Sequence, residues 1–205
     1  MPGVTDKFFT CTHRVRLAKT AELSEATLAV DTEAAKLCGG LSEEQLSWRP
    51  RPRSWSIAQN LAHLRITTEV FLPAVDSTLE ASRKLKLYGE GPYTLNLFGR
   101  VMVWRMESRP IIKMQAPRSV WPRLLSCPAL ELEHFLLAQA ALRRRIADAD
   151  GLDLTALRFH SPVASYFRVN LLEFFSACNA HSRRHLWQAN RVRQALPSSV
   201  LQDHS

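Results

Sequence analysis

The sequence predicts an all-α protein, a four-helix bundle with an irregular crossover excursion between its second and third helices. Apolar residues recur at spacings of three and four in residues 19–38, 57–82, 129–149 and 168–196, as expected where one face of each helix turns toward a shared core. Residues 83–128 are instead interrupted by prolines and glycines, which favour turns. We therefore expect less than a tenth of the residues to lie in strands.

The first helix, residues 19–38, ends at a Gly-Gly pair, which favours helix termination. Residues 41–55 follow. We expect them to form a turn and an extended link, because Pro50 and Pro52 disfavour helical geometry in the residues that precede them.

The second helix has a clear start signal. Ser56 is suited to the N-cap, and Gln59 stands three residues later, so the two can form a capping box. Pro73 is expected to kink this helix rather than end it, because apolar spacing resumes at Val75 and Leu79.

The excursion and the last third of the chain complete the pattern. Residues 94–108 are predicted to form a short amphipathic helix, and the proline-rich stretch after them an extended crossover. The third helix is expected to end near Gly151, and residues 152–167 to form a loop. Pro197 should stop the last helix.

Length and charge limit the function. A chain of 205 residues suits one domain, which we divide into an N-terminal extension (1–18), a bundle (19–197) and a C-terminal tail (198–205). The net charge is +8, but the basic residues are dispersed, which favours solvated helix faces over a nucleic-acid surface. No stretch approaches the roughly 20 apolar residues of a membrane span.

The cysteines and the first residues indicate a cytoplasmic protein. The four cysteines lie far apart and form no C-x-x-C motif, which argues against a cysteine zinc site and fits a reducing compartment. The first residues contain no apolar run long enough for a signal peptide.

Two histidines lie four residues apart in the last predicted helix. His181 and His185 share a face with apolar residues such as Phe174 and Val192. An H-x3-H pair can offer two imidazoles to one metal ion, although such pairs also occur at surfaces or hydrogen-bonded within a core. No H-E-x-x-H motif is present, so the sequence does not indicate a zinc protease.

A third histidine, His63, lies on the apolar side of the second helix. Three imidazoles would hold a metal ion and leave coordination positions for water or substrate. The remaining histidines fit such a site less well. His13 and His204 are near the termini, His160 is in a predicted loop, and His134 lies on the polar side of its helix.

Two segments make the chain resemble a known family. "LSEEQLSWRPRPRSWSIAQNLAHL" resembles the stretch of the DinB/YfiT-like superfamily that leads into its first metal-binding histidine, and "HSRRHLWQANRVR" resembles the H-x3-H segment of its last helix. The crossover "MQAPRSVWP" and the "SPVASYF" segment are similar to one branch of the same superfamily.

This resemblance implies a DinB-type four-helix bundle with a mononuclear divalent metal site formed by His63, His181 and His185. Some relatives are thiol S-transferases that use low-molecular-weight thiols such as bacillithiol or mycothiol. The resemblance therefore implies a metal-dependent enzyme acting on a small molecule, with thiol transfer as one reaction. A hydrolase and a non-catalytic metal-binding bundle are the alternatives, and formation of a homodimer stays open.

The ligand set sets limits on the chemistry. A metal bound by neutral imidazoles keeps its positive charge and can lower the pKa of bound water to about 7 or ionise a bound thiol. A set of three imidazole ligands does not distinguish Zn, Ni, Fe or Mn.

Several neighbouring residues either contribute to such a site or have a simpler structural role. Gln188, one turn beyond His185, could contact the ligand or cofactor at the metal, or simply pack at the bundle edge. Cys178 is most simply a small buried residue, and Arg183 and Arg184 are expected to be solvated. The aromatic segment 93–104 could line a pocket above the metal.

Overall fold

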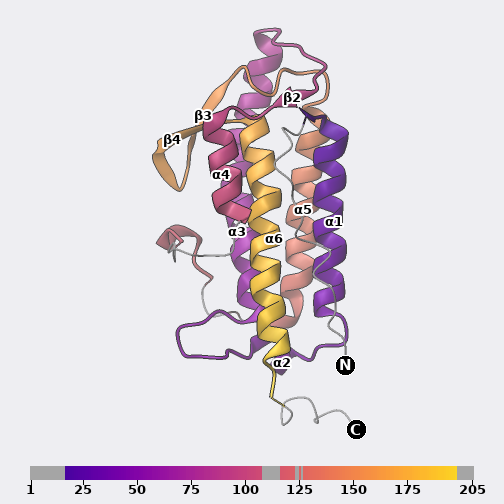
Figure 1. The fold of residues 1–205 in the computed structure, drawn as a ribbon, viewed down its shortest axis with the longest axis vertical. Coiled ribbons are helices and arrows are strands. Elements are labelled where there is room, and N and C mark those ends of the chain that lie inside the picture. The colour runs from indigo at the N-terminus through magenta and orange to yellow at the C-terminus, as the bar shows by residue number, and fades with distance from the viewer. Residues whose placement is uncertain (1–16, 108–115, 123–124, 126, 198–205) are drawn as a thin grey trace.

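The computed structural model describes residues 17–107, 116–122, 125 and 127–197. About 66% of the described residues are helical. Four long helices pack as a bundle (Figure 1): α1 (Thr20–Cys38), α3 (Ile57–Lys84), α5 (Glu131–Asp148) and α6 (Leu171–Gln194). The predicted all-α bundle is therefore confirmed. None of the described helices is both long enough and apolar enough to cross a bilayer.

The interior of the bundle holds two apolar clusters. One includes Phe71, Phe174 and Phe175, and the other includes Leu61 and Leu186. On α6 the first cluster extends to Cys178, and the second begins at Leu186. His181 and His185 therefore occupy the stretch of α6 between the two clusters.

Capping boxes start three of the described helices, and one of them is α6, with Asn170 and Glu173. The Ser56 hydroxyl accepts a hydrogen bond from the Gln59 backbone N–H, and the Gln59 side chain accepts one from the Ser56 N–H, as predicted. α3 then continues through Pro73 to Lys84. The same arrangement of Ser42 and Gln45 begins a short helix, α2 (Glu43–Ser47). The prediction of only a turn and an extended link in residues 41–55 was therefore wrong, because this second S-x-x-Q pattern also satisfies free backbone N–H groups.

The segment predicted as a loop, residues 152–167, contains most of a β-hairpin. Strands β3 (Arg158–Ser161) and β4 (Ala164–Asn170) pair antiparallel, with Phe159 opposite Val169. Aromatic and β-branched residues favour strands, and the Ser-Pro turn signal marks the turn between the two strands. The last helix consequently begins at Leu171, after its Asn170 cap, rather than at Arg168.

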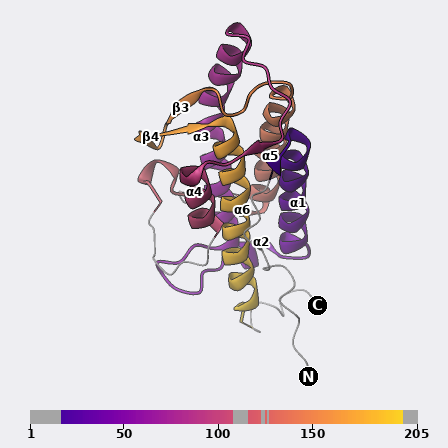
Figure 2. The same ribbon diagram turned by 45° about the horizontal axis from the view of Figure 1, so that its top comes forward.

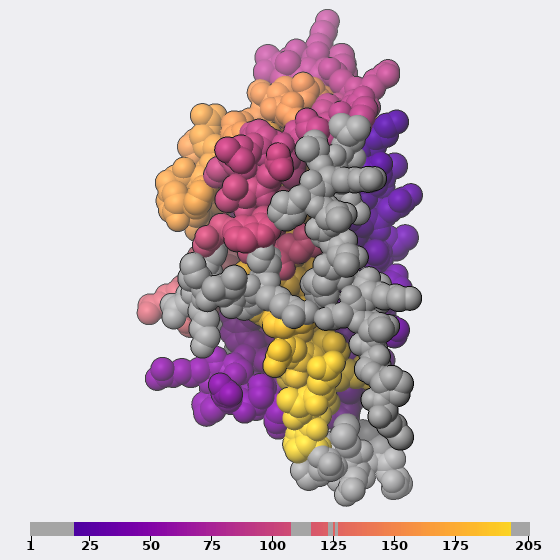
Figure 3. All heavy atoms as spheres, viewed as in Figure 1, coloured from indigo at the N-terminus to yellow at the C-terminus, as the bar shows by residue number. Residues whose placement is uncertain are grey.

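The excursion adds a short helix to the side of the bundle. α4 (Leu97–Glu107) confirms the short helix predicted for residues 94–108, although most of its large apolar residues are exposed, and it packs on α6 beside the hairpin (Figures 1 and 2). Atoms of α4 and of the hairpin adjoin on the surface in Figure 3. The ring centroids of Phe98, in α4, and Phe167, in β4, are 6.2 Å apart. A Cβ added at Gly99 would lie 2.9 Å from Glu173 Cγ, so glycine permits this close approach.

Strand β2 (Tyr93–Thr94), just before α4, pairs with β1 (Leu17–Ala18). Two 3-10 turns, η1 (Arg118–Val120) and η2 (Pro128–Leu130), belong to the predicted crossover. The rest of that crossover falls largely outside the described residues. The same holds for most of the predicted extension, for the tail, and for His13 and His204.

Candidate metal centre

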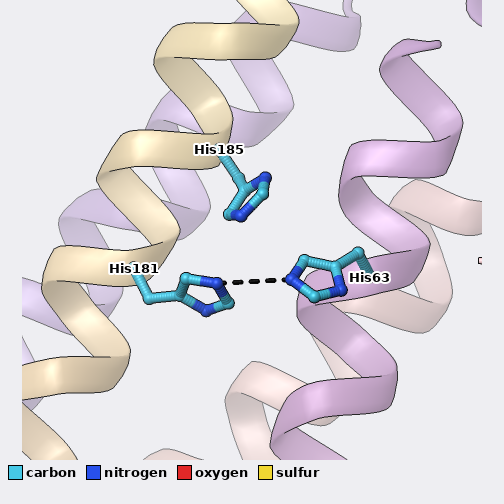
Figure 4. Close-up of side chains that lie close together, drawn as sticks. All are labelled: His63, His181 and His185. Carbon is cyan, nitrogen blue, oxygen red and sulfur yellow. Dashed lines mark hydrogen bonds between the residues drawn. The ribbon is translucent and has the colours of Figure 1, made fainter. Parts of the chain in front are cut away.

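Three histidines from two helices converge inside the bundle. His63 projects from α3, and His181 and His185 project from α6 toward it (Figure 4). One ring nitrogen from each lies within 4.8 Å of the others. His63 and His185 are buried, and His181 is partly buried. We call these residues the histidine cluster.

A backbone carbonyl orients the ring of His63. Its Nδ1 lies 2.7 Å from the carbonyl oxygen of Val120 in η1. A carbonyl can only accept, so Nδ1 carries the proton and Nε2 has a free lone pair. The excursion between α3 and α5 thus fixes which nitrogen of His63 faces the cluster.

An asparagine orients His185 in the same way. The Nδ1 of His185 lies 3.0 Å from Asn60 Oδ1, and the Asn60 amide nitrogen donates to the Ser56 carbonyl at 2.8 Å. Because the amide nitrogen is committed to Ser56, Oδ1 is the acceptor and Nδ1 of His185 is the donor. Its Nε2 is left with a free lone pair, as a metal ligand requires.

The spacing of the ring nitrogens fits a metal ion. The Nε2 atoms of His63 and His181 are 3.3 Å apart. Two nitrogens of a tetrahedral zinc site are about 3.3 to 3.4 Å apart, given zinc–nitrogen distances near 2.0 to 2.1 Å. The same separation also allows one proton to be shared between the two rings. The donor set therefore fits a divalent ion, and a hydrogen-bonded histidine pair is the metal-free equivalent.

Burial keeps the three imidazoles neutral. It is the main cause that lowers the pKa of each ring, and it lowers that of His181 to about 3. The neighbouring histidines and Arg184 lower the pKa values of His181 and His185 further. Neutral imidazole is the form that binds metal, so the cluster is ready to coordinate an ion at neutral pH.

Sequence reasoning missed two side chains around the cluster. Trp55 stacks on His185, with ring centroids 5.7 Å apart, and its ring centroid lies 4.8 Å from that of His63, so it packs against two rings of the cluster. Asn60 is buried one turn before His63. A buried polar residue on the face that carries His63 was the signal that could have identified it.

The expectation that Arg183 and Arg184 are solvated was wrong. Arg183 forms an ion pair with Glu107 at 2.7 Å, and Arg184 donates to the carbonyl of Arg105 at 3.1 Å. Both contacts reach α4, whose packing on α6 was not foreseen. His160 was also misplaced, because it lies in β3 rather than in a loop.

The other positions with a functional interpretation have simpler surroundings. Gln188 is half-buried and makes no hydrogen bond with another described residue, so its contact with a ligand stays a prediction. Cys178 packs against the first apolar cluster, and burial raises the pKa of its thiol to about 12, which suits a small apolar residue. In the aromatic segment, Tyr93 donates to the Leu152 carbonyl, and Phe98 faces the hairpin rather than the histidine cluster.

Comparison with known families agrees with this architecture. The model of the DinB superfamily matches residues 27–189, which include all three histidines. The chain therefore belongs to the DinB superfamily. A comparison with curated proteins found no match.

Proposed function

We propose that this protein is a metal-dependent enzyme that binds one divalent ion through His63, His181 and His185. It joins a small thiol, through its sulfur atom, to an electrophilic substrate. The observation that carries the proposal is the orientation of the rings. Hydrogen bonds at Nδ1 of His63 and His185 leave both Nε2 atoms available as ligands, and the Nε2 atom of His63 lies 3.3 Å from that of His181.

The protein's own residues supply the conditions for such a site. Val120 and Asn60 hold the rings in the ligating tautomer, and Trp55 packs against two of them. Within the part of the chain that the structure describes, no carboxylate or thiol joins the cluster. A bound divalent ion would lower the pKa of a thiol or a water molecule beside it, and three neutral ligands leave its charge available for that purpose.

The family and the cluster support metal binding, and the reaction is inferred from the charge of the site. An ion held by neutral ligands favours an anionic fourth ligand. A thiol with a free pKa of about 8.5 ionises more readily than water, so it is the better candidate at neutral pH.

A cobalt-substituted sample tests the proposal. Adding 2-mercaptoethanol should produce a sulfur-to-cobalt charge-transfer band and release a proton, because the thiol loses its proton on binding. Metal-loaded wild-type protein should then consume thiol in the presence of an electrophile such as 1-chloro-2,4-dinitrobenzene, faster than the His181→Ala variant does.

The alternatives give different results. No band with any thiol, together with cleavage of p-nitrophenyl acetate, would replace the transferase with a hydrolase. Metal binding without either reaction would favour a non-catalytic bundle.

A further inference from the structure

Arg184 lies beside the histidine cluster and has no carboxylate partner among the described residues. It is three residues after His181 on α6, which places both on one side of the helix. The side chain is half-buried, and its Nη1 donates to the Arg105 carbonyl. Its remaining N–H groups make no hydrogen bond with another described residue.

The other half-buried arginines of the described residues are satisfied differently. Five form ion pairs with carboxylates: Arg65 with Glu131, Arg143 with Asp31, Arg145 with Asp76, Arg158 with Glu173, and Arg183 with Glu107. Arg193 reaches the carbonyls of Lys36, Leu37 and Gly39 at the end of α1. Arg184 makes one neutral contact, so it stands apart from the rest of the set.

The guanidinium of Arg184 is half-buried and contacts the backbone of a second arginine, Arg105. A partly buried guanidinium without a counterion is costly. A bound anion would remove that cost.

We propose that Arg184 binds the carboxylate of an anionic ligand, the thiol or its acceptor, whose other end reaches the histidine cluster. This inference rests on the proposed function, because it takes the metal as the second point of attachment. A guanidinium binds a carboxylate through two parallel hydrogen bonds. The preferred ligand should therefore carry a negative group in addition to its reactive atom.

Two small thiols that differ in charge test the proposal on cobalt-loaded protein. Mercaptoacetate carries a carboxylate, and 2-mercaptoethanol carries a hydroxyl. Titration of the charge-transfer band should show mercaptoacetate binding to the wild-type protein about tenfold to hundredfold more tightly, as expected for a charge-assisted contact. Arg184→Gln should remove that preference and leave the affinity for 2-mercaptoethanol within about twofold.

Control variants separate a specific contact from general charge. Arg184→Lys should keep part of the preference, since it keeps the charge and one donor. Arg144→Gln removes an exposed arginine on α5 and should change neither affinity. The cobalt absorption bands without thiol should be the same in all variants, which shows that the histidine cluster is intact.

Loss of affinity for both thiols alike in Arg184→Gln, or an unchanged preference, would overturn the inference. If neither thiol binds, the transferase proposal fails, and binding of acetate then tests the role of Arg184 by itself. In cobalt-loaded wild-type protein the acetate methyl proton signal should be broadened, and in Arg184→Gln it should be broadened much less. Equal broadening, or none with either protein, would overturn the role of Arg184.

Discussion

Two buried polar clusters lie along α6, and they differ in how completely the protein satisfies them. At the start of the helix, the carboxylate of Glu173 is 1% exposed. It accepts hydrogen bonds from Asn96, Arg158 and the Asn170 backbone at 2.9 to 3.2 Å. Two to three turns later, one ring nitrogen of each histidine in the cluster lies within 4.8 Å of the others, and no carboxylate among the described residues pairs with Arg184.

The difference separates a structural cluster from a binding site. Buried polar groups are normally hydrogen-bonded, and Glu173 follows this rule while joining α4, β3 and α6. In the histidine cluster, the Nδ1 atoms of His63 and His185 have hydrogen-bond partners. Among the described residues, the one contact made by the Nε2 atoms is that between His63 and His181. We infer that the first cluster contributes stability and the second contributes binding.

The largest expected effect is on the structural cluster. Glu173→Ala leaves Arg158, Asn96 and the start of α6 without their acceptor. It should lower the free energy of unfolding by about 3 to 5 kcal/mol, as for other broken buried pairs. Urea denaturation of metal-free protein measures this, with the exposed Glu133→Ala as control. A loss below 1 kcal/mol would mean that this cluster is not structural.

The second prediction is that a substitution in the histidine cluster affects metal binding strongly and stability weakly. His181→Leu should reduce metal affinity by more than about a hundredfold, because ligands matter more than the partners that orient them. In metal-free protein it should change the free energy of unfolding by no more than about 1 kcal/mol, since only the contact with His63 is lost. A competition titration with a chelator and urea denaturation measure the two quantities. Large destabilisation without a change in metal affinity would show that the histidine cluster contributes stability and not binding.

The third prediction concerns the residue that orients His185. Asn60→Ala removes the acceptor of the Nδ1–H group and should weaken metal binding about tenfold to hundredfold. Asn190→Ala, at an exposed position on α6, is the matched control. Equal affinities for both variants would show that the tautomer of His185 is not set by Asn60.

The smallest effect is a pH dependence of the metal-free protein. The folded-state pKa of His181 is about 3, and the unfolded-state pKa is about 6.5. Between these pH values the unfolded chain binds more protons than the folded chain. The free energy of unfolding therefore falls as the pH drops below about 6.5, and the contribution of His181 is fully present above that pH. His181→Leu should reduce this slope by up to about 1.4 kcal/mol per pH unit. An unchanged slope between pH 6.5 and 5.5 would show that His181 is protonated easily in the folded protein.

The helices were predictable because local signals define them. Apolar spacing located all four, and the capping box of Ser56 fixed the first turn of α3. Residues 158–170 were harder, because a short hairpin with a Ser-Pro turn and a loop share the same turn residues. α2 carries the same capping signal as α3, but its five residues are too few to show the apolar repeat that predicts a helix.

The histidines could be predicted because their sequence positions define a shared face, whereas their partners could not. Val120 contributes a backbone carbonyl from a turn 57 residues away from His63, and such a contact leaves no mark on residue identity. Arg184 was misjudged for a related reason. The docking of α4 on α6 that half-buries it depends on Gly99 and Glu173, which no local pattern connects.

The most direct test of this account is the metal content of purified protein, measured by mass spectrometry after exposure to excess Zn²⁺ and removal of weakly bound ions. The wild-type protein should retain close to one ion per chain. The double variant His181→Ala/His185→Ala should retain almost none while staying helical by circular dichroism, because one remaining imidazole does not hold a divalent ion. One ion per chain in the double variant, or none in the wild-type protein, would contradict the account.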